Sequence, residues 1–415
     1  MKTYLFYAFL AGILFVFSAC KEESQTIGLE VIDVETAYRH PSEIRASDYF
    51  SHIRYVPLET SDSVLIGKSP SLFATGDKLV ITSEQHPCFA FDKENGAFRN
   101  VIGHIGNDPT GSVRSDGWFN EKNACMYFPA GNFRSVVYDL NNNFKGYFHD
   151  IERYYGFYGA YCYTWLDSTT LAAHFPANDK LPDRVILFRD TTRLATIAVP
   201  HSTISLIPST TEEMETFQVF QKLICGHDVL YLHFKNQLVL PVIPAVDPFW
   251  HAGDKLYFKE LYNDTIYRVS QTDLLPERVF DFGSMRYAFE DRYKEHKDHA
   301  IFPLDIYENQ TVLWMRFAVD ILHPKACKNY NLLYNKQKQK AQVAPFQEGI
   351  SNDLTHFLSL QPSYANAEGE FFQLLSAEEI ADWFDSHPEV ANLPPEVEQL
   401  RHLTPDDNPV VVIMK

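Results

Sequence analysis

The chain has 415 residues, and 45% of them are hydrophobic, so it can bury a large core and is not an intrinsically disordered chain. It carries 54 acidic and 36 basic residues, a net charge of −18, and nucleic-acid phosphates would repel such a surface, so no nucleic-acid partner is expected. Aromatic residues reach 14%, which favours β-sheets, because aromatic side chains suit their half-buried faces.

The first segment in chain order has the pattern of an export signal. Lys2 precedes an apolar run from Tyr4 to Phe17, and two small residues separate this run from Cys20. The run is too short for a membrane-spanning helix and has the usual length of a secretory signal peptide. Its end resembles a bacterial lipobox, in which the cysteine is lipidated and becomes the first mature residue. We predict a cleaved lipoprotein signal peptide over residues 1–19; the alternative is an ordinary signal peptide cleaved after another small residue.

The residues after Cys20 indicate where the anchored protein resides. Lys21-Glu22-Glu23-Ser24 resembles the short acidic signals that direct Bacteroidota lipoproteins to the outer face of the outer membrane. Acidic tethers are also simply well solvated, which is the alternative explanation. The prediction is an outer membrane lipoprotein on the periplasmic or cell-surface face. Residues 20–26 are then the lipidated cysteine and a polar tether, and the membrane is a partner through the lipid on Cys20.

Beyond the tether, short apolar segments alternate with turn clusters nearly to the C-terminus, a pattern that predicts strands. Asn95-Gly96 is a strong turn signal, because both residues tolerate positive φ. Similar strand–turn–strand segments recur about every 50 residues, as in the blades of β-propellers. Strands are expected at 79–81, 88–91, from 98, 136–140, from 144, 185–188, 194–199, 255–258, 264–269, 278–283, 311–317 and 331–335.

Few segments have the pattern of a helix. Residues 377–386 are the better candidate, with Ser376 as the N-cap and Glu378-Glu379 in the first turn. The charged segment 287–299 is the second candidate.

Three stretches of the chain carry a family resemblance. They are Tyr55-Val56-Pro57-Leu58-Glu59-Thr60 with Ile66-Gly67, Tyr262-Asn263-Asp264-Thr265-Ile266-Tyr267-Arg268-Val269, and Asp407-Asn408-Pro409-Val410-Val411-Val412. These stretches resemble signatures of the six-bladed β-propeller lipoproteins of Bacteroidota. The resemblance implies an all-β fold, a single six-bladed β-propeller over residues 27–415. The ring is expected to close by pairing 27–34, or the segment around 55–58, with 410–414, because an unclosed sheet edge invites aggregation.

The sequence contains no motif for nucleophilic catalysis or phosphate binding. Asp139-Leu140-Asn141-Asn142-Asn143 imitates the start of a calcium loop, but Phe144 stands where that loop needs glycine. A polar hairpin turn is the favoured interpretation. His296 and His299 lie close together without the further ligands of a metal site, and a solvated helix face explains them.

An aromatic run between residues 154 and 165 is the candidate ligand-binding segment. Tyr and Trp offer a large contact area with a polar handle, and the interleaved Gly156 and Gly159 suggest a loop entering a strand. The candidates for stacking on a sugar are Tyr154, Tyr155, Tyr158, Tyr161 and Trp165. Aromatic packing between blades is the alternative, and it is the more common role of such residues.

Five cysteines besides Cys20 are widely spaced, with no C-x-x-C pair. They are Cys88, Cys125, Cys162, Cys225 and Cys327. We expect buried free thiols, with one disulfide bridge as the alternative.

The predicted function is a non-catalytic binding or interaction module of the cell envelope, with a glycan, peptide or protein ligand. The first alternative is a metal-dependent enzyme of the lactonase, lyase or hydrolase kind, with His and carboxylates around a central metal. The second is a structural subunit of an envelope complex, which predicts a large exposed apolar patch and no pocket. No cofactor is expected, although a metal such as calcium in the channel stays open, and no catalytic residue is assigned.

Overall fold

The structure is a computed structural model that describes residues 28–131, 134–149, 162–178, 180–204, 214–235, 239–243, 246–288 and 299–415. The predicted signal peptide, Cys20 and the tether up to residue 26 lie outside these ranges, and so does most of the candidate helix 287–299. No helix of the described residues is long and apolar enough to cross a membrane.

Six sheets of the described chain contain a four-stranded antiparallel meander. The first is β3 (Ser71–Thr75), β4 (Lys78–Thr82), β5 (Cys88–Asp92) and β6 (Phe98–Ile102); the second is β7 (Trp118–Asn120), β8 (Cys125–Pro129), β9 (Arg134–Asp139) and β10 (Phe144–His149). The third is β11 (Cys162–Trp165), β12 (Thr170–Phe175), β13 (Arg184–Arg189) and β14 (Thr192–Ala198); the fourth is β18 (Phe249–Ala252), β19 (Lys255–Phe258), β20 (Thr265–Val269) and β21 (Leu274–Asp281). The fifth is β22 (Ile301–Glu308), β23 (Val312–Val319), β24 (Lys328–Asn335) and β25 (Lys340–Pro345); the sixth is β26 (Tyr364–Ala365), β27 (Phe371–Leu375), β28 (Val410–Met414) and β2 (Ile53–Pro57).

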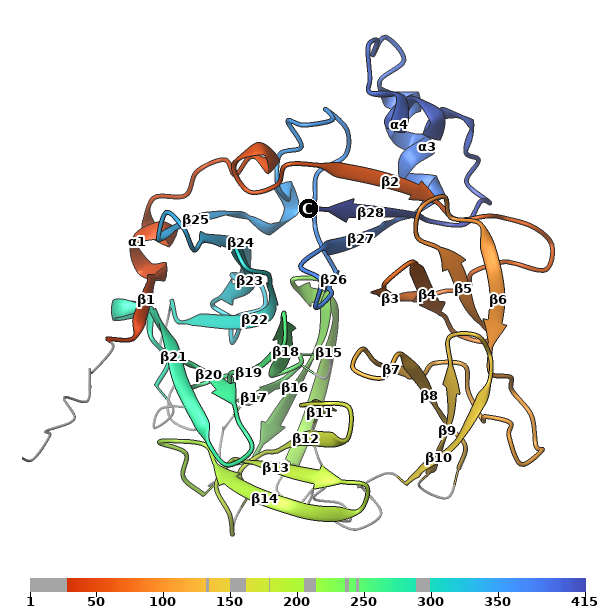
Figure 1. Ribbon diagram of the computed structural model, residues 1–415. Helices are drawn as coiled ribbons and strands as arrows, with labels where there is room; N and C mark the ends of the chain where they lie inside the picture. The colour runs from red at the N-terminus through yellow and green to blue at the C-terminus, as the bar shows by residue number, and fades with distance from the viewer. Residues whose placement is uncertain are drawn as a thin grey trace, which may run out of the picture.

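These sheets stand around a common centre in a propeller-like ring (Figure 1). The first strand of each meander, such as β3, β7 or β22, lies nearest the centre, and the last lies at the rim. The middle strands are mostly buried, and β12 and β23 are buried along their whole length. They read as continuous apolar runs because a neighbouring sheet covers each face. The all-β prediction and the predicted strands of the ring are therefore confirmed.

The ring closes through a strand from the N-terminal part of the chain. β2 pairs antiparallel with β28, with Ile53 opposite Met414 and Pro57 opposite Val410. Of the two expected closing segments, the one around 55–58 is therefore confirmed. The other, 27–34, is wrong: β1 (Glu30–Asp33) runs parallel to β21 and adds a fifth strand to the fourth sheet.

The segment between β1 and β2 runs along the outside of the ring (Figure 1). It contains α1 (Val34–Arg39) and the 3-10 helix η1 (Ala46–Asp48). The Ser42 N–H donates to the Val343 carbonyl of β25 at 2.9 Å, and the Ala46 N–H donates to the Ser351 carbonyl at 2.8 Å. Residues 30–57 thus connect the fourth, fifth and sixth sheets.

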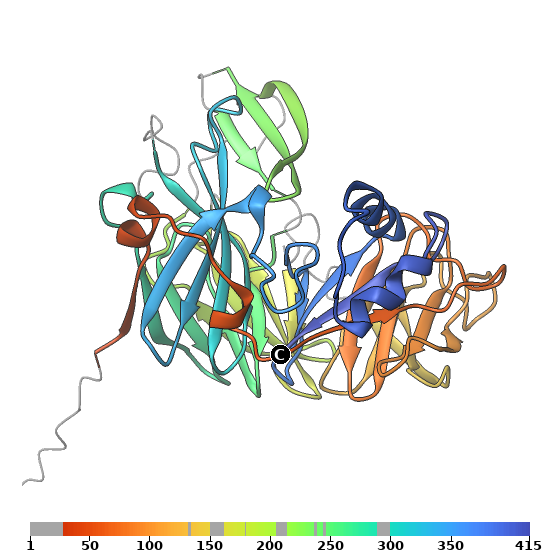
Figure 2. The ribbon, with the colours of Figure 1, turned by 90° about the horizontal axis from the view of Figure 1, so that it is seen from above.

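A seventh sheet is not one of the sheets of the ring and rises from one of its faces (Figure 2). It consists of β15 (Met214–Ile224), β16 (His227–Phe234) and β17 (Val239–Val242), and it lies between the third and fourth sheets in sequence. We call it the inserted sheet. It rises from the same side of the ring as α3 (Ala377–Ser386) and α4 (Pro395–Glu398) (Figure 2). The predicted α3 is confirmed with its Ser376 N-cap, and Glu379 completes a capping box there.

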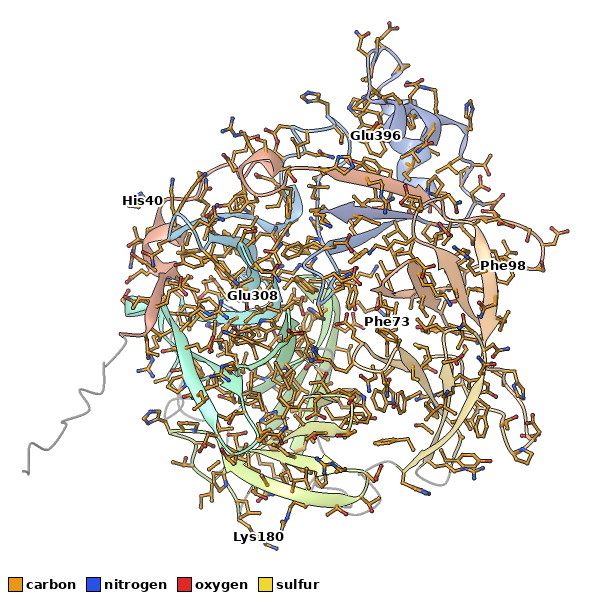
Figure 3. The ribbon with its side chains drawn as sticks, in the orientation of Figure 1. His40, Phe73, Phe98, Lys180, Glu308 and Glu396 are labelled. Carbon is orange, nitrogen blue, oxygen red and sulfur yellow. The ribbon has the colours of Figure 1, made fainter. Side chains whose placement is uncertain are left out.

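A buried charge network joins the fourth and fifth sheets, around Glu308, which lies near the middle of the ring (Figure 3). Trp250 Nε1 donates to Glu308 Oε2 at 2.6 Å, and Lys336 Nζ donates to Oε1 at 2.5 Å. The Arg278 guanidinium binds both oxygens of the same carboxylate. Glu308 is only 1% exposed, so this one carboxylate fixes groups from both sheets in a dry interface.

Candidate binding site

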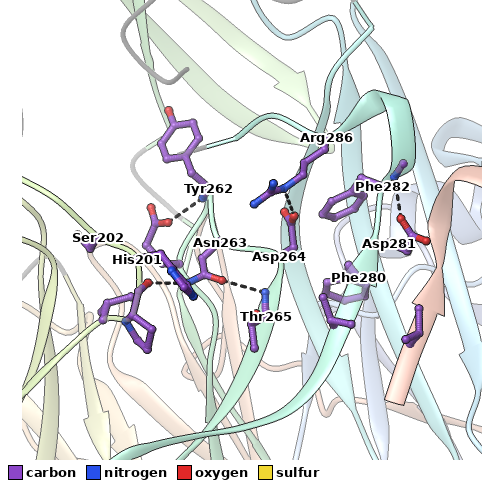
Figure 4. A pocket seen from close by; sticks show the side chains of 16 residues that line it. His201, Ser202, Tyr262, Asn263, Asp264, Thr265, Phe280, Asp281, Phe282 and Arg286 are labelled. Atoms are coloured by element: carbon purple, nitrogen blue, oxygen red, sulfur yellow. Dashed lines mark hydrogen bonds and ion pairs between the residues drawn. The ribbon is translucent and has the colours of Figure 1, made fainter. Parts of the chain in front are cut away.

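Two cavities adjoin where the third and fourth sheets meet. The outer cavity has a volume of about 560 Å³ and lies between the end of β14 and the strands β20 and β21 (Figure 4). The inner cavity, of about 260 Å³, lies beside the inserted sheet and the fifth sheet. Glu260 and Tyr262 line both cavities. The loop from 259 to 264, which connects β19 to β20, therefore separates them.

Asn263 holds this loop in place. Its Oδ1 accepts from the Thr265 N–H at 3.0 Å, and its Nδ2 donates to the Pro200 carbonyl of the neighbouring sheet at 3.1 Å. Glu260 adds a second local constraint, because its Oε2 accepts from the Tyr262 N–H at 2.8 Å. The loop is thus fastened both to itself and to the third sheet.

The outer cavity has both polar and apolar walls. Arg286 donates to Asp264 across it, and Asp281 accepts from the Gly283 N–H at 2.9 Å (Figure 4). Burial raises the pKa of the Asp264 carboxyl, although Lys259 and Arg286 act in the opposite direction. His201 and Ser202 complete the wall on the side of the third sheet.

The inner cavity is mostly apolar. Its lining includes Leu240, Pro241 and Val242 of β17, with Trp250, Phe302, Leu304 and Ile306 of the ring. Polar groups lie at a few points of this lining. Among them, Asp183 accepts from the Ser202 hydroxyl at 2.6 Å and lies 3.5 Å from His174 Nε2. Burial alone would raise the pKa of Asp183, but the hydrogen bonds from His174 and Ser202 keep it below its ordinary value.

Lys259 is the unusual residue of the inner cavity. It is 6% exposed, and its Nζ donates to the carbonyls of Glu260 at 3.1 Å and Leu261 at 3.5 Å. Among the described residues no carboxylate forms an ion pair with it. Burial lowers the pKa of the Lys259 ammonium to about 8, despite the nearby charges of Asp264 and Glu260. The Lys259 Nζ also lies over the Phe280 ring, 6.0 Å from its centre. A charge held in a dry site without a carboxylate partner is destabilising, and such groups concentrate at functional sites.

Asp247 provides a second perturbed group at the inner cavity. Its Oδ1 accepts from the Cys162 thiol at 2.9 Å and from the Phe249 N–H at 2.8 Å. The side chain keeps contact with solvent, but the surrounding protein raises the pKa of its carboxyl. The burial of Cys162 and the nearby Asp247 charge raise the pKa of the Cys162 thiol well above its usual value, which makes this thiol a poor nucleophile.

An apolar cavity with a few convergent polar groups and perturbed pKa values is typical of a ligand site. The Lys259 ammonium can donate a hydrogen bond to a ligand or attract a negative charge on it, and the Glu260 and Asp247 carboxyl groups can accept hydrogen bonds. Within the described ranges, no cluster of three or more His, Cys, Asp and Glu side chains could hold a metal ion.

Most of the predicted site residues are not among the described residues. Tyr154, Tyr155, Tyr158 and Tyr161 fall outside the described residues, as does Cys20. Trp165 is described: it is 7% exposed and stacks on Trp118 with ring centroids 6.0 Å apart. For this residue the structure favours packing between sheets, and the stacking role of the four tyrosines stays a prediction.

Two other predictions can be compared with the structure. Asp139 closes a polar hairpin turn between β9 and β10, and its Oδ1 accepts from the N–H groups of Asn141 at 3.0 Å and Asn143 at 2.9 Å. The favoured hairpin interpretation is therefore confirmed. All five cysteines of the described chain are free, and three of them are buried.

The cavity residues had no signal in the sequence. Lys259, Asp247 and His174 come from separate loops and strands, and only the packing of three sheets brings them together. The one usable hint was the family-like stretch from Tyr262 to Val269, which includes part of the loop that separates the cavities.

The family model for a domain of unknown function, DUF4934, matches residues 29–415. The chain belongs to this family. No curated protein matches the chain in sequence. Among solved structures, a Bacteroides fragilis protein inferred to be exported has a TM-score of 0.55 at 12% identity, over 93% of this chain and 99% of its own. Its similarity shows a shared fold for this DUF4934 protein.

Two further solved structures are similar at lower TM-scores. The WD40 repeats of RRP9 have a TM-score of 0.35 at 8% identity, over 90% of this chain and 100% of theirs. BamB from Moraxella catarrhalis has a TM-score of 0.30 at 10% identity, over 90% of both chains.

Proposed function

We propose that this protein is a non-catalytic binding module of the cell envelope and that the adjoining cavities are its ligand site. In this proposal the six meander sheets are the blades of a six-bladed propeller. The ring supplies a rigid scaffold, and the loop from 259 to 264 presents polar groups to the ligand. Fold similarity gives no function by itself, so the proposal rests on the site.

The observation that carries the proposal is the Lys259 ammonium. It lies in an apolar cavity, is 6% exposed and donates only to two backbone carbonyls of the described residues. An ammonium has three hydrogens, so one donor is left for a ligand. A ligand acceptor that completes this set would remove much of the cost of burying the charge.

The lining suggests the chemical character of the ligand. The inner cavity would take an apolar group against Trp250 and Leu304, with a hydrogen-bond acceptor directed at Lys259. The outer cavity, which has Asp281 and Arg286 in its wall, would hold a remainder with hydrogen-bonding groups, such as sugar hydroxyls or a peptide backbone. Such an amphipathic ligand agrees with a glycan conjugate or a peptide.

A thermal-shift screen of soluble Lys21–Lys415 tests the proposal. The panel holds glycans, glycolipid headgroups, apolar peptides, divalent metals and EDTA. A ligand that binds only the folded state raises the Tm by mass action. We expect a metal-independent shift with an amphipathic ligand, and its loss in Lys259→Met. A shift that is the same in Lys259→Met would place the ligand elsewhere and contradict the proposed site.

A second candidate function is catalysis with Lys259 as a general base. Its lowered pKa, about 8, favours this alternative, because general bases work best with a pKa near the operating pH. A ligand that is released chemically changed would support it. A ligand recovered intact after prolonged incubation would favour the binding module.

For the localisation of the protein, we propose that it is an outer membrane lipoprotein anchored through Cys20. The lipobox-like sequence supports this, and so does the structural similarity to a protein inferred to be exported. Metabolic labelling with a fatty acid should mark the wild type and not Cys20→Ala. A labelled Cys20→Ala protein would contradict the proposed anchor.

A further inference from the structure

Among the described residues, one apolar face of the inserted sheet is not part of the core on which the sheet packs. Cross-strand pairing puts six apolar side chains on this face: Phe217, Val219, Leu230, Leu232, Leu240 and Val242. None of the six is fully buried, and Phe217 is 58% and Val219 57% exposed. The opposite face is different, because Val229 and Tyr231 are buried in a core that contains Phe302 of the fifth sheet. In the described chain the sheet is therefore packed into the core by one face only, while Leu240 and Val242 at the β17 edge of the other face line the inner cavity.

The same sheet also has a long free edge. β15 is the outer strand in the order β15-β16-β17 and has 11 residues. In the described chain no strand pairs with its outer side. Soluble proteins usually protect such edges with proline, central charges or short length. β15 contains no proline, and its charged residues, Glu215 and Lys222, lie toward its two ends.

We propose that β15 pairs antiparallel with β15 of a second copy of this chain and so forms a continuous six-stranded sheet. A two-fold axis perpendicular to the sheet keeps each side chain on its own face, and one residue then lies opposite itself. β15 pairs regularly with β16 from Thr216 to Phe220, between two irregularities. The middle of this regular stretch is Gln218, so the axis passes through Gln218.

This register is complementary in apolar contact and in charge. Phe217 lies opposite Val219 of the second copy, and the reverse pair forms on the other side of the axis, so the two apolar faces join. Aromatic and β-branched pairs of this kind stabilise sheets. The antiparallel order also places Glu215 opposite Gln221 of the second copy, next to Lys222, whereas a parallel order would align like charges.

Disulfide trapping tests the register. In antiparallel pairs, opposite Cα atoms lie about 4.5–5.5 Å apart, within the range of a disulfide. Mild oxidation of Gln218→Cys in the chain Lys21–Lys415 should therefore give a covalent dimer. The matched control is Glu215→Cys, whose two copies would lie about 20 Å apart in this register. We expect at least about tenfold more cross-linked dimer from Gln218→Cys; equal yields would overturn the proposed register.

Sedimentation equilibrium tests the surface independently of cysteine chemistry. The wild type should show a monomer–dimer equilibrium. The double variant Phe217→Lys, Val219→Lys should weaken it at least about tenfold, because edge charges block strand pairing. Both side chains are exposed, so the variant should keep the wild-type Tm. A wild type that is monomeric throughout, or a dimer that the double variant leaves intact, would overturn the proposal.

Discussion

At the scale of single residues, two buried charges of this molecule differ in their surroundings. Glu308 is bound by Arg278, Lys336 and Trp250, so its charge is compensated in the interface between two sheets. Lys259 lies in a cavity and donates only to backbone carbonyls of the described chain. The first arrangement is that of a structural group, and the second is that of a group left available to a ligand.

The Glu308 network predicts a large loss of stability in Glu308→Gln. Removing one partner of a buried charge network typically costs about 3–5 kcal/mol, because the remaining cations stay buried. Burial alone would raise the pKa of Glu308, but Arg278 and Lys336 hold it below its usual value. Its contribution is therefore present above the unfolded pKa of about 4.3 and is lost as the pH falls through the lower folded value.

Urea unfolding at pH 7 and at low pH measures this contribution, and Glu398→Gln is the matched control. Glu398 forms an exposed ion pair with Arg401 at 2.7 Å, and such pairs contribute little. A Glu308→Gln variant that unfolds like the control at pH 7 would show that the network is not structural.

Removal of the Lys259 charge should have the opposite effect on stability from removal of the Glu308 charge. Its pKa is lowered to about 8, against about 10.4 in an unfolded chain, so between these values the unfolded state binds more protons. This group therefore contributes stability that rises with pH across the window from about 8 to about 10.4. Lys259→Met should be more stable than the wild type by about 1–3 kcal/mol at pH 7, since an apolar group replaces a buried charge. The difference should shrink toward pH 10; a constant difference would contradict the lowered pKa.

At the scale of elements, β2, the strand that closes the ring, packs on the turn between β5 and β6 of the first sheet. Gly96 lies between β5 and β6 with φ +74°, and a Cβ on it would lie 1.9 Å from the Pro57 carbonyl oxygen of β2. The Glu59 N–H donates to the Gly96 carbonyl at 2.9 Å. The Asn-Gly signal predicted the turn correctly. Its packing on β2 had no sequence signal, because the two segments are distant in the chain.

Gly96→Ala should therefore be more destabilising than an ordinary substitution at positive φ. The left-handed conformation alone costs an L-residue about 1–2 kcal/mol, and the backbone contact with Pro57 adds to it. Gly76→Ala is the matched control, with φ +54° and no atom within 4 Å of its Cβ position. Thermal unfolding of both variants should show the larger loss for Gly96→Ala. Equal losses of thermal stability in the two variants would mean that the turn can move away from β2 without a cost, which would contradict the close packing.

At the scale of the whole molecule, the middle strands of the sheets in the ring were predictable because they are buried on both faces. Segments such as 185–188 and 255–258 read as strands for this reason. The inserted sheet was not predicted, since β15 is exposed over most of its length and does not show an alternation of buried apolar and exposed polar residues. The cavities were not predictable either. Their residues meet only after three sheets and the inserted sheet have packed, and no local pattern encodes that meeting.

Calorimetry provides the decisive test of the proposed ligand site. It compares the affinity of the best ligand from the screen for the wild type, Lys259→Met and Lys255→Met. Lys255 lies on the same sheet with a 54% exposed side chain and lines neither cavity. A hydrogen bond to a charged group contributes about 1.5–3 kcal/mol, so the Kd should rise at least about tenfold in Lys259→Met and stay unchanged in Lys255→Met. Equal affinity for all three proteins would contradict a ligand site at these cavities.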